Sequence, residues 1–295
     1  MKKILFVIIF ALILILTACI QESVEVEISP SNTTTNKPTE NQENNQDITN
    51  DVTEETEEVI TETPIEKDPV EEINIEEPIS QDYYMSEKSY DIKTKDESIN
   101  KDIVLLTFDD GPKEEEMLTK MLDILDKHNA KAIFFVNGYR IEQNPDLLKL
   151  IYDRGQIIGN HSWDHINLKN ESNEKINQQV EDVQNIVEEL TGEKPIYFRP
   201  PHGAGNEYLR KKVKEEGMLY MTWSNGSEDW VKKYQYSEGV IQNVMGRLRA
   251  GSNILMHELP WTVEALDTLL SSIEEEGYRF VDPRAIDIEY EIPQN

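Results

Sequence analysis

The chain has 295 residues and a net charge of −29 at pH 7, from 58 acidic and 29 basic side chains. So large a negative charge argues against nucleic acid as a partner. The single cysteine, Cys19, excludes a disulfide within the chain.

The first residues predict a signal peptide over residues 1–18. Lys2 and Lys3 precede an apolar run over residues 4–16, which is shorter than the roughly twenty residues of a spanning helix. The next residues, up to Cys19, resemble a bacterial lipobox. That resemblance implies cleavage before Cys19 and a lipid on its sulfur, although an uncut membrane anchor is an alternative.

Residues 20–80 contain no Phe, Trp or Tyr, and their eighteen acids against two lysines give a charge of −16. Such a segment cannot build a core, and its charges repel one another. We expect a disordered acidic linker over residues 19–98, able to span roughly 40–50 Å on average, and a folded domain over residues 99–295.

Within that domain, short apolar runs alternate with amphipathic helical patterns, which predicts an α/β fold with a parallel sheet. The expected strands cover residues 103–108, 132–136, 156–159, 196–199, 219–223, 253–257 and 278–281. Expected helices include residues 117–128, 174–190 and 263–276.

Two polar segments lie at the ends of these expected strands. Asp109 and Asp110 are adjacent carboxylates that need compensation by a metal or a proton, although Asp-Gly-Pro is also ordinary turn sequence. His161 and His165 are four residues apart, a spacing that lets both imidazoles meet at one ion from one face of a helical turn.

The four tryptophans lie close to such polar clusters. For Trp223 a core position is the better interpretation, whereas Trp163, Trp230 and Trp261 lie beside charged residues and favour a ligand groove.

In chain order, five segments resemble the motif series of the polysaccharide deacetylase family, the NodB homology domain of carbohydrate esterases. They are TFDDGP (107–112), HSWDH (161–165), FRPPHG (198–203), SNGSEDW (224–230) and LMH (255–257). The resemblance covers about two-thirds of the chain, and an ordered series of motifs is far more specific than any single motif. It implies a distorted, incomplete (β/α) barrel of about seven parallel strands, with the motifs at the carboxyl ends of the strands.

The resemblance also implies a metal site and a base. Asp110, His161 and His165 match the metal ligands, and Asp109 matches the catalytic base that deprotonates a metal-bound water. The expected cofactor is one divalent ion, zinc first, with cobalt, nickel or manganese as alternatives.

The remaining roles follow from the later motifs. Arg199 matches the arginine that orients the base, and His257 matches the general acid that protonates the departing amine. Residues implied in substrate binding are His202 through its backbone N–H, Leu255 beside the acetyl methyl, Trp230 and Trp163; Leu255 is equally compatible with plain core.

Two departures from the family pattern stand out. His202 replaces the usual tyrosine, which a backbone N–H role tolerates. Gly226 stands where an aspartate usually tunes the acid histidine, so we expect a lowered pKa for His257 and reduced, pH-shifted or lost activity.

The resemblance implies N-deacetylation of N-acetylglucosamine or N-acetylmuramic acid in a surface polysaccharide, first peptidoglycan, with poly-N-acetylglucosamine as another possible glycan. We expect a monomer, held by lipid on Cys19 at the outer face of a bacterial membrane and reaching into the cell wall. The alternatives are a weak or inactive wall-binding protein of the same fold and an O-acetyl esterase.

Overall fold

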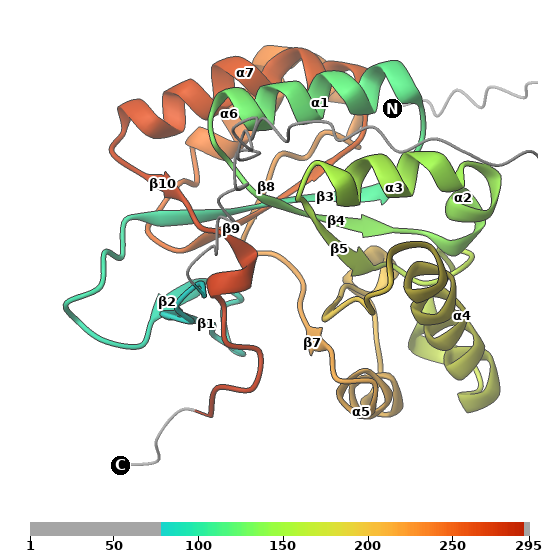
Figure 1. The fold of residues 1–295 in the computed structure, drawn as a ribbon. Helices are drawn as coiled ribbons and strands as arrows, with labels where there is room; N and C mark the ends of the chain where they lie inside the picture. The colour runs from blue at the N-terminus through green and yellow to red at the C-terminus, as the bar shows by residue number, and fades with distance from the viewer. Residues whose placement is uncertain (1–77, 292–295) are drawn as a thin grey trace, which may run out of the picture. The chain divides into compact units, whose positions relative to one another are not determined.

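Seven parallel strands form a curved sheet at the centre of residues 78–291, the part of the chain that the computed structural model describes (Figure 1). Along the sheet they are β7 (Leu219–Tyr220), β6 (Tyr197–Phe198), β5 (Ile157–Asn160), β4 (Ala132–Val136), β3 (Ile103–Gly111), β9 (Ser252–His257) and β8 (Asn225–Gly226). A further strand, β10 (Arg279–Phe280), pairs in parallel with the start of β3. The predicted incomplete barrel is confirmed.

The central strands are buried on both faces, as the near-continuous apolar runs of parallel sheets require. Every residue of β4 is buried, and so are the first seven residues of β3. The helices that follow the strands are α1 (Glu115–Lys127), α2 (Gly138–Gln143), α3 (Pro145–Asp153), α4 (Asn173–Thr191), α5 (Glu207–Glu215), α6 (Ser237–Met245) and α7 (Pro260–Glu275). Helices α1 and α7 lie side by side on one face of the sheet, and their apolar sides join the largest hydrophobic cluster (Figure 1).

Each of the seven predicted strands has a counterpart, although β6, β7 and β10 are only two residues long. The structure also has β8, which lies inside the motif at residues 224–230 and pairs with β9. Asn225 and Gly226 lie between two serines, so no apolar run marks this strand in the sequence.

A short antiparallel hairpin precedes the sheet. Its strands, β1 (Tyr83–Met85) and β2 (Ile92–Thr94), bury Met85 and Ile92 in a cluster with Ile103 of β3. Gly251, at φ +83°, lies so close to this hairpin that a Cβ there would be 2.1 Å from the Ile92 carbonyl oxygen. The folded part of the chain therefore begins before residue 99, the predicted boundary.

The predicted signal peptide, Cys19 and most of the predicted linker fall in residues 1–77, outside the described residues. Within residues 78–291, no helix is both long and apolar enough to cross a bilayer.

Candidate active site

The two adjacent aspartates lie at the end of β3, where the pairing with β4 shifts register between Asp109 and Gly111. In a regular strand, neighbouring side chains point to opposite faces. Here Asp110 has φ +68°, and this bulge directs its carboxylate toward the same histidine that Asp109 approaches. Both acids thereby reach one site at the carboxyl edge of the sheet.

Asp109 is 3% exposed and is held by a buried arginine. The Arg199 guanidinium donates to Asp109 Oδ1 over 2.7 Å and to the Thr107 hydroxyl over 2.8 Å. Its other terminal nitrogen donates to the Thr222 carbonyl and to Asn253 Oδ1. Burial lowers the pKa of Arg199, and the Asp109 charge opposes that shift. Arg199 therefore fixes the orientation of the Asp109 carboxylate, while the catalytic roles of the two residues stay predictions.

Asp110, His161 and His165 bring one ligand atom each within 4.8 Å of one another. Nε2 of His165 lies 3.1 Å from Asp110 Oδ1, and Nε2 of His161 lies 3.5 Å from the same oxygen. Burial raises the pKa of Asp110, but the close approach of the His161 and His165 side chains and the charges of His161 and His257 outweigh burial and hold that pKa well below its usual range.

These three residues fit a cation. Nδ1 of His161 lies 2.7 Å from the Arg199 carbonyl oxygen, which only accepts, so Nδ1 carries a proton, and in the neutral imidazole Nε2 presents a lone pair to the carboxylate. Asp110 Oδ1 is buried yet has no hydrogen bond of good geometry. Two lone-pair-bearing groups that face each other are stabilised by a metal ion between them.

The histidine segment is not helical, contrary to the expected single face of a helical turn. Residues 161–165 form an irregular loop after β5, in which Ser162 and His165 have φ of +68° and +54°. The imidazoles still converge, because the loop folds back over the end of β5 and their ring centroids lie 5.0 Å apart.

Asn137, which the sequence analysis did not single out, supports this loop. It is fully buried, and its side-chain Nδ2 donates to the carbonyl oxygens of His161 (2.8 Å) and Ser162 (3.2 Å). Its backbone N–H donates to the Gly111 carbonyl over 3.0 Å. One residue therefore ties the Asp110 segment to the His161 segment.

His257 ends β9 and lies beside Asp109 in the register of the two parallel strands. Its Nδ1 is 2.7 Å from Oδ1 of Asp229, a carboxylate with no exposed surface. The other oxygen, Asp229 Oδ2, accepts from the His257 backbone N–H and from the Thr262 hydroxyl, at 2.8 and 2.7 Å. Asp229 is thus fully engaged in holding His257.

This pair corrects the expectation that Gly226 leaves His257 without a carboxylate. Burial lowers the pKa of His257, but the hydrogen bond and charge of Asp229, with the charges of Asp109 and Asp110, raise it above its usual value. Asp229 occupies the position beside Nδ1, whereas a Cβ on Gly226 would meet the rings of Trp223 and Trp230.

The four residues predicted to bind substrate lie around this centre. Trp230 is 44% exposed and stands edge-on to His257, with ring centroids 5.3 Å apart. His202, at φ +60°, stands edge-on to His165 at 4.8 Å, and Leu255 is buried in β9. Trp163 packs on Gly138, where a Cβ would meet its ring at 2.1 Å. Their contacts with substrate stay predictions.

Glu258, next to the acid histidine, is a second residue that the sequence analysis missed. It is 1% exposed, and its Oε1 accepts from the backbone N–H groups of Lys113 and Glu114 at 2.9 and 3.2 Å. Its Oε2 faces Gly111, where a Cβ would lie 2.7 Å away. Glu258 therefore joins the end of β9 to the loop that follows the two aspartates.

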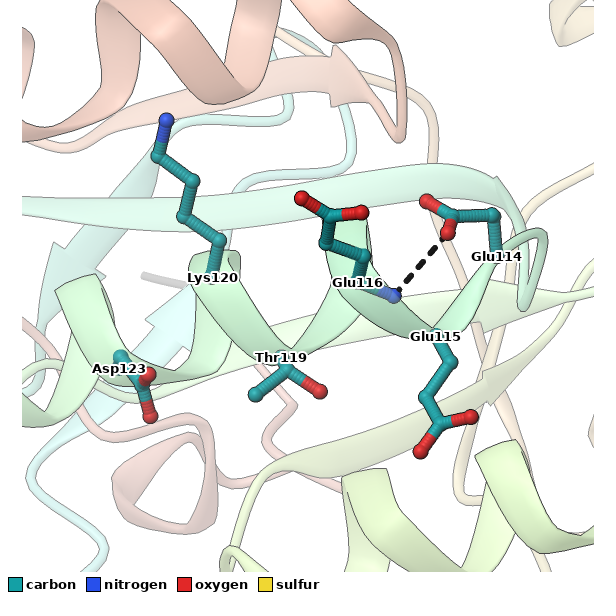
Figure 2. Close-up of a pocket in the computed structure, with 6 residues that line it drawn as sticks. All are labelled: Glu114, Glu115, Glu116, Thr119, Lys120 and Asp123. Atoms are coloured by element: carbon teal, nitrogen blue, oxygen red, sulfur yellow. Dashed lines mark hydrogen bonds between the residues drawn. The ribbon is translucent and has the colours of Figure 1, made fainter.

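An open hollow elsewhere, along α1, does not compete with this centre. Its lining is mostly acidic and contains none of the candidate metal ligands and none of Asp109, Arg199, Asp229 and His257: Glu114, Glu115, Glu116, Thr119, Lys120 and Asp123 (Figure 2). The Glu114 carboxylate there accepts from the Glu116 backbone N–H and caps the helix.

Comparison with known proteins agrees with this geometry. Residues 96–221 match the family model for polysaccharide deacetylase. The chain is 40% identical over 179 residues to the peptidoglycan-N-acetylglucosamine deacetylase PgdA of Listeria monocytogenes, a match that covers 60% of this chain and 37% of that protein. The chain thus spans little more than a third of that relative's length.

Two further matches bear on activity. The peptidoglycan-N-acetylmuramic acid deacetylase PdaA of Bacillus subtilis is 33% identical over 64% of this chain and 74% of its own length. A solved structure from Bacillus anthracis, BA3943, is similar with a TM-score of 0.59 and 33% identity, covering 62% of this chain and 64% of that one; it is described as a pseudoenzyme of carbohydrate esterase family 4. The chain belongs to the polysaccharide deacetylase family.

Proposed function

We propose that this protein removes N-acetyl groups from N-acetylglucosamine or N-acetylmuramic acid residues of a cell-wall polysaccharide, and that the polysaccharide is peptidoglycan. The observation that carries the proposal is that a carboxylate and an imidazole, each held by its own partner, lie beside one set of candidate metal ligands. Asp109 is ionically held by Arg199, and His257 is held by Asp229 on the neighbouring strand. Asp109 is suited to act as a base and His257 to act as an acid.

Asp110, His161 and His165 would hold the metal, which we propose to be zinc. A divalent ion there supplies Lewis acidity, polarising the acetyl carbonyl and lowering the pKa of a water toward neutrality. The His161 tautomer, set by the Arg199 carbonyl, leaves Nε2 free to coordinate.

The proton transfers belong to the protein's own side chains. Asp109 Oδ2, the oxygen that Arg199 does not contact, accepts the proton of the attacking water. His257 carries a proton on Nε2 when its Nδ1–H is bonded to Asp229, and it delivers that proton to the departing sugar nitrogen. The His202 backbone N–H is the proposed donor to the developing oxyanion.

The glycan assignment is supported by the relatives and by one exposed ring. Two of the relatives named above, PgdA and PdaA, are peptidoglycan deacetylases, one for each of the two wall sugars. Trp230 presents a partly exposed indole beside His257, which suits stacking against a sugar ring.

The direct test is mass spectrometry of glycans incubated with the metal-supplemented protein. We expect acetyl groups to be lost from peptidoglycan fragments, and more slowly or not at all from chitooligosaccharides and acetyl-xylan. Loss from acetyl-xylan alone would identify an O-acetyl esterase. No loss from any glycan, with metal bound, would favour a wall-binding role like that of a pseudoenzyme.

We also propose that lipid on Cys19 holds the protein at the outer face of the bacterial membrane, with the acidic segment before residue 78 reaching into the wall. This part of the proposal is supported by the sequence alone. Cys19→Ala should end incorporation of labelled palmitate, and labelling that persists in this variant would refute the anchor.

A further inference from the structure

One face of α4 is buried through apolar side chains, and a glutamine interrupts it. Gln179 is 1% exposed and lies between Ile176 and Val180, which are buried on the same face of the helix. A buried amide costs free energy unless its donors and its acceptor are paired. The partners of Gln179 therefore show what a polar side chain does at this position.

The Gln179 amide pairs with Asp164, the residue before the proposed metal ligand His165. Its Oε1 accepts from the Asp164 backbone N–H over 2.8 Å, and its Nε2 donates to Asp164 Oδ2 over 2.7 Å. The Gln179 carbonyl also accepts from the Trp163 backbone N–H over 3.0 Å. Lys175 donates to Asp164 Oδ2 as well, at 3.3 Å, but an ion pair this exposed contributes little. Gln179 thus provides the buried support for the second half of the histidine loop, residues 161–165.

The first half of the histidine loop has different support. Asn137 donates to the carbonyl oxygens of His161 and Ser162. The His161 ring is oriented by the Arg199 carbonyl, 2.7 Å from its Nδ1. None of these bonds involves the last two residues of the loop.

His165 has no comparable bond to orient its ring. Within residues 78–291 its Nδ1 has no hydrogen-bond partner, and 28% of its side chain is exposed, against 3% for His161. Its backbone has φ +54°, a conformation that is uncommon for a residue other than glycine and that the surroundings must maintain. The backbone therefore sets the place of the His165 imidazole, and Gln179 holds that backbone at the preceding residue.

We propose that Gln179 is a positioning residue of the metal site, which holds the His165 imidazole in place through Asp164. The inference rests on the proposed metal set of Asp110, His161 and His165. Removing the support of a metal ligand typically weakens metal binding by roughly ten- to hundredfold. A glutamine that only joins α4 to its neighbours would affect stability and leave the metal affinity of the folded protein unchanged.

Zinc affinity, measured on the folded full chain by competition with a chelator, tests the proposal. Gln179→Leu removes both amide bonds at similar volume, and Gln179→Glu sets a second carboxylate against Asp164. Both should bind zinc more weakly than the wild type by roughly tenfold or more. The matched control is Gln156→Leu, because Gln156 is also buried but bonds to Ala130 and Ala132 before and at the start of β4. This control should keep the wild-type zinc affinity.

An exchange of the amide and the carboxylate separates positioning from packing. When Gln179→Glu is combined with Asp164→Asn, the amide introduced at 164 can donate to the carboxylate introduced at 179. The side-chain bond is then restored with donor and acceptor exchanged, so the double variant should recover the zinc affinity of Asp164→Asn alone. If the two single variants at 179 bind zinc as the wild type does, or if the double variant is no better than Gln179→Glu, the proposal is overturned.

A double-mutant cycle with His165 shows whether the effect passes through that ligand. In a His165→Ala background, Gln179→Leu should cause no further loss of zinc affinity. A further loss as large as the one in the wild-type background would contradict a route through His165.

Zinc binding also separates this inference from the proposed reaction. If the wild type binds zinc and the variants differ as expected, yet no acetate is released, the reaction fails and the positioning role stands. Acetate release by a wild type whose zinc affinity is unaffected by Gln179→Leu refutes the positioning role alone. A wild type that binds no divalent ion overturns both.

Discussion

Asp229 sets the protonation state of His257 through a buried hydrogen bond of 2.7 Å. Its carboxylate also accepts from the His257 backbone N–H and from Thr262, so neither oxygen is free to turn away. An imidazolium held in this way keeps its proton at a higher pH than a free histidine. That property suits a general acid that works near neutral pH.

Replacing Asp229 by Asn should therefore move the alkaline limb of the pH–rate profile to lower pH. A general acid must be protonated, and removing a partner charge changes an imidazole pKa by roughly one unit, or about 1.4 kcal/mol. Rate against pH on one acetylated oligosaccharide measures the shift, with the exposed Asp123→Asn as control. An unchanged limb in Asp229→Asn would show that His257 is not the acid.

The same pair makes a prediction for stability. The folded-state pKa of His257 is raised, so its contribution is fully present below the unfolded value of about 6.5 and is lost as pH rises through the folded value. The wild type should therefore be more stable than Asp229→Asn at low pH. The difference between their unfolding free energies, measured by denaturant titration, should become smaller as pH rises through the folded-state pKa. A gap that widens with rising pH would contradict the assignment.

At the scale of elements, the site is assembled by loops that follow β3, β4 and β5, and Asn137 holds the three together. It begins α2, contacts the Gly111 carbonyl after β3, and contacts the His161 and Ser162 carbonyls after β5. The histidine loop contains two residues with positive φ, so these bonds help to maintain its conformation.

Asn137→Ala should weaken metal binding by roughly tenfold or more, the usual effect of removing support from metal ligands. Loss of its buried hydrogen bonds should also lower stability by about 1–3 kcal/mol. The matched control is Asn225→Ala, another buried asparagine, which donates to the Val244 carbonyl instead. Chelator competition measures affinity. If the two variants bind the metal with equal affinity and have similar stability, Asn137 contributes to packing and not to the support of the metal ligands.

The grouping of the candidate site residues was predictable because these residues lie within short motifs, although their catalytic roles stay predictions. Asp109, Asp110, His161, His165, Arg199 and His257 are found together where the motif series placed them. The supporting residues were not predictable, because their roles depend on contacts between distant segments. Asp229 and Thr262 are 33 residues apart, and Glu258 reaches Lys113 across 145 residues. Motif spacing alone predicted that the carboxylate partner of His257 would be missing at Gly226, and it did not reveal that Asp229 is that partner.

The fold, too, was predictable only in part from the sequence. The long apolar runs of β3, β4 and β9 identified the sheet, whereas β8 and the β1–β2 hairpin are too short for periodicity to detect. The hairpin's place in the core rests on Met85 and Ile92, two isolated apolar residues in a polar stretch.

At the scale of the whole molecule, the hairpin decides where the folded part begins. A chain that starts at residue 78 should fold with the full stability of the domain. A chain that starts at residue 99 should lose several kcal/mol, because burying a side chain such as Met or Ile contributes about 1.5–3 kcal/mol. Thermal unfolding of the two chains compares them, and equal midpoints would show that the hairpin is dispensable.

The two adjacent aspartates are assigned different tasks, Asp109 as the base and Asp110 as a metal ligand, and one paired measurement tests this assignment. Metal content and acetate release are measured together for wild type, Asp109→Asn and Asp110→Asn on a peptidoglycan oligosaccharide. Asp109→Asn should keep its divalent ion and lose acetate release, because an amide fills the same space but accepts no proton. Asp110→Asn should lose both. Wild-type acetate release by Asp109→Asn, or metal loss equal to that of Asp110→Asn, would contradict the assignment of base and ligand.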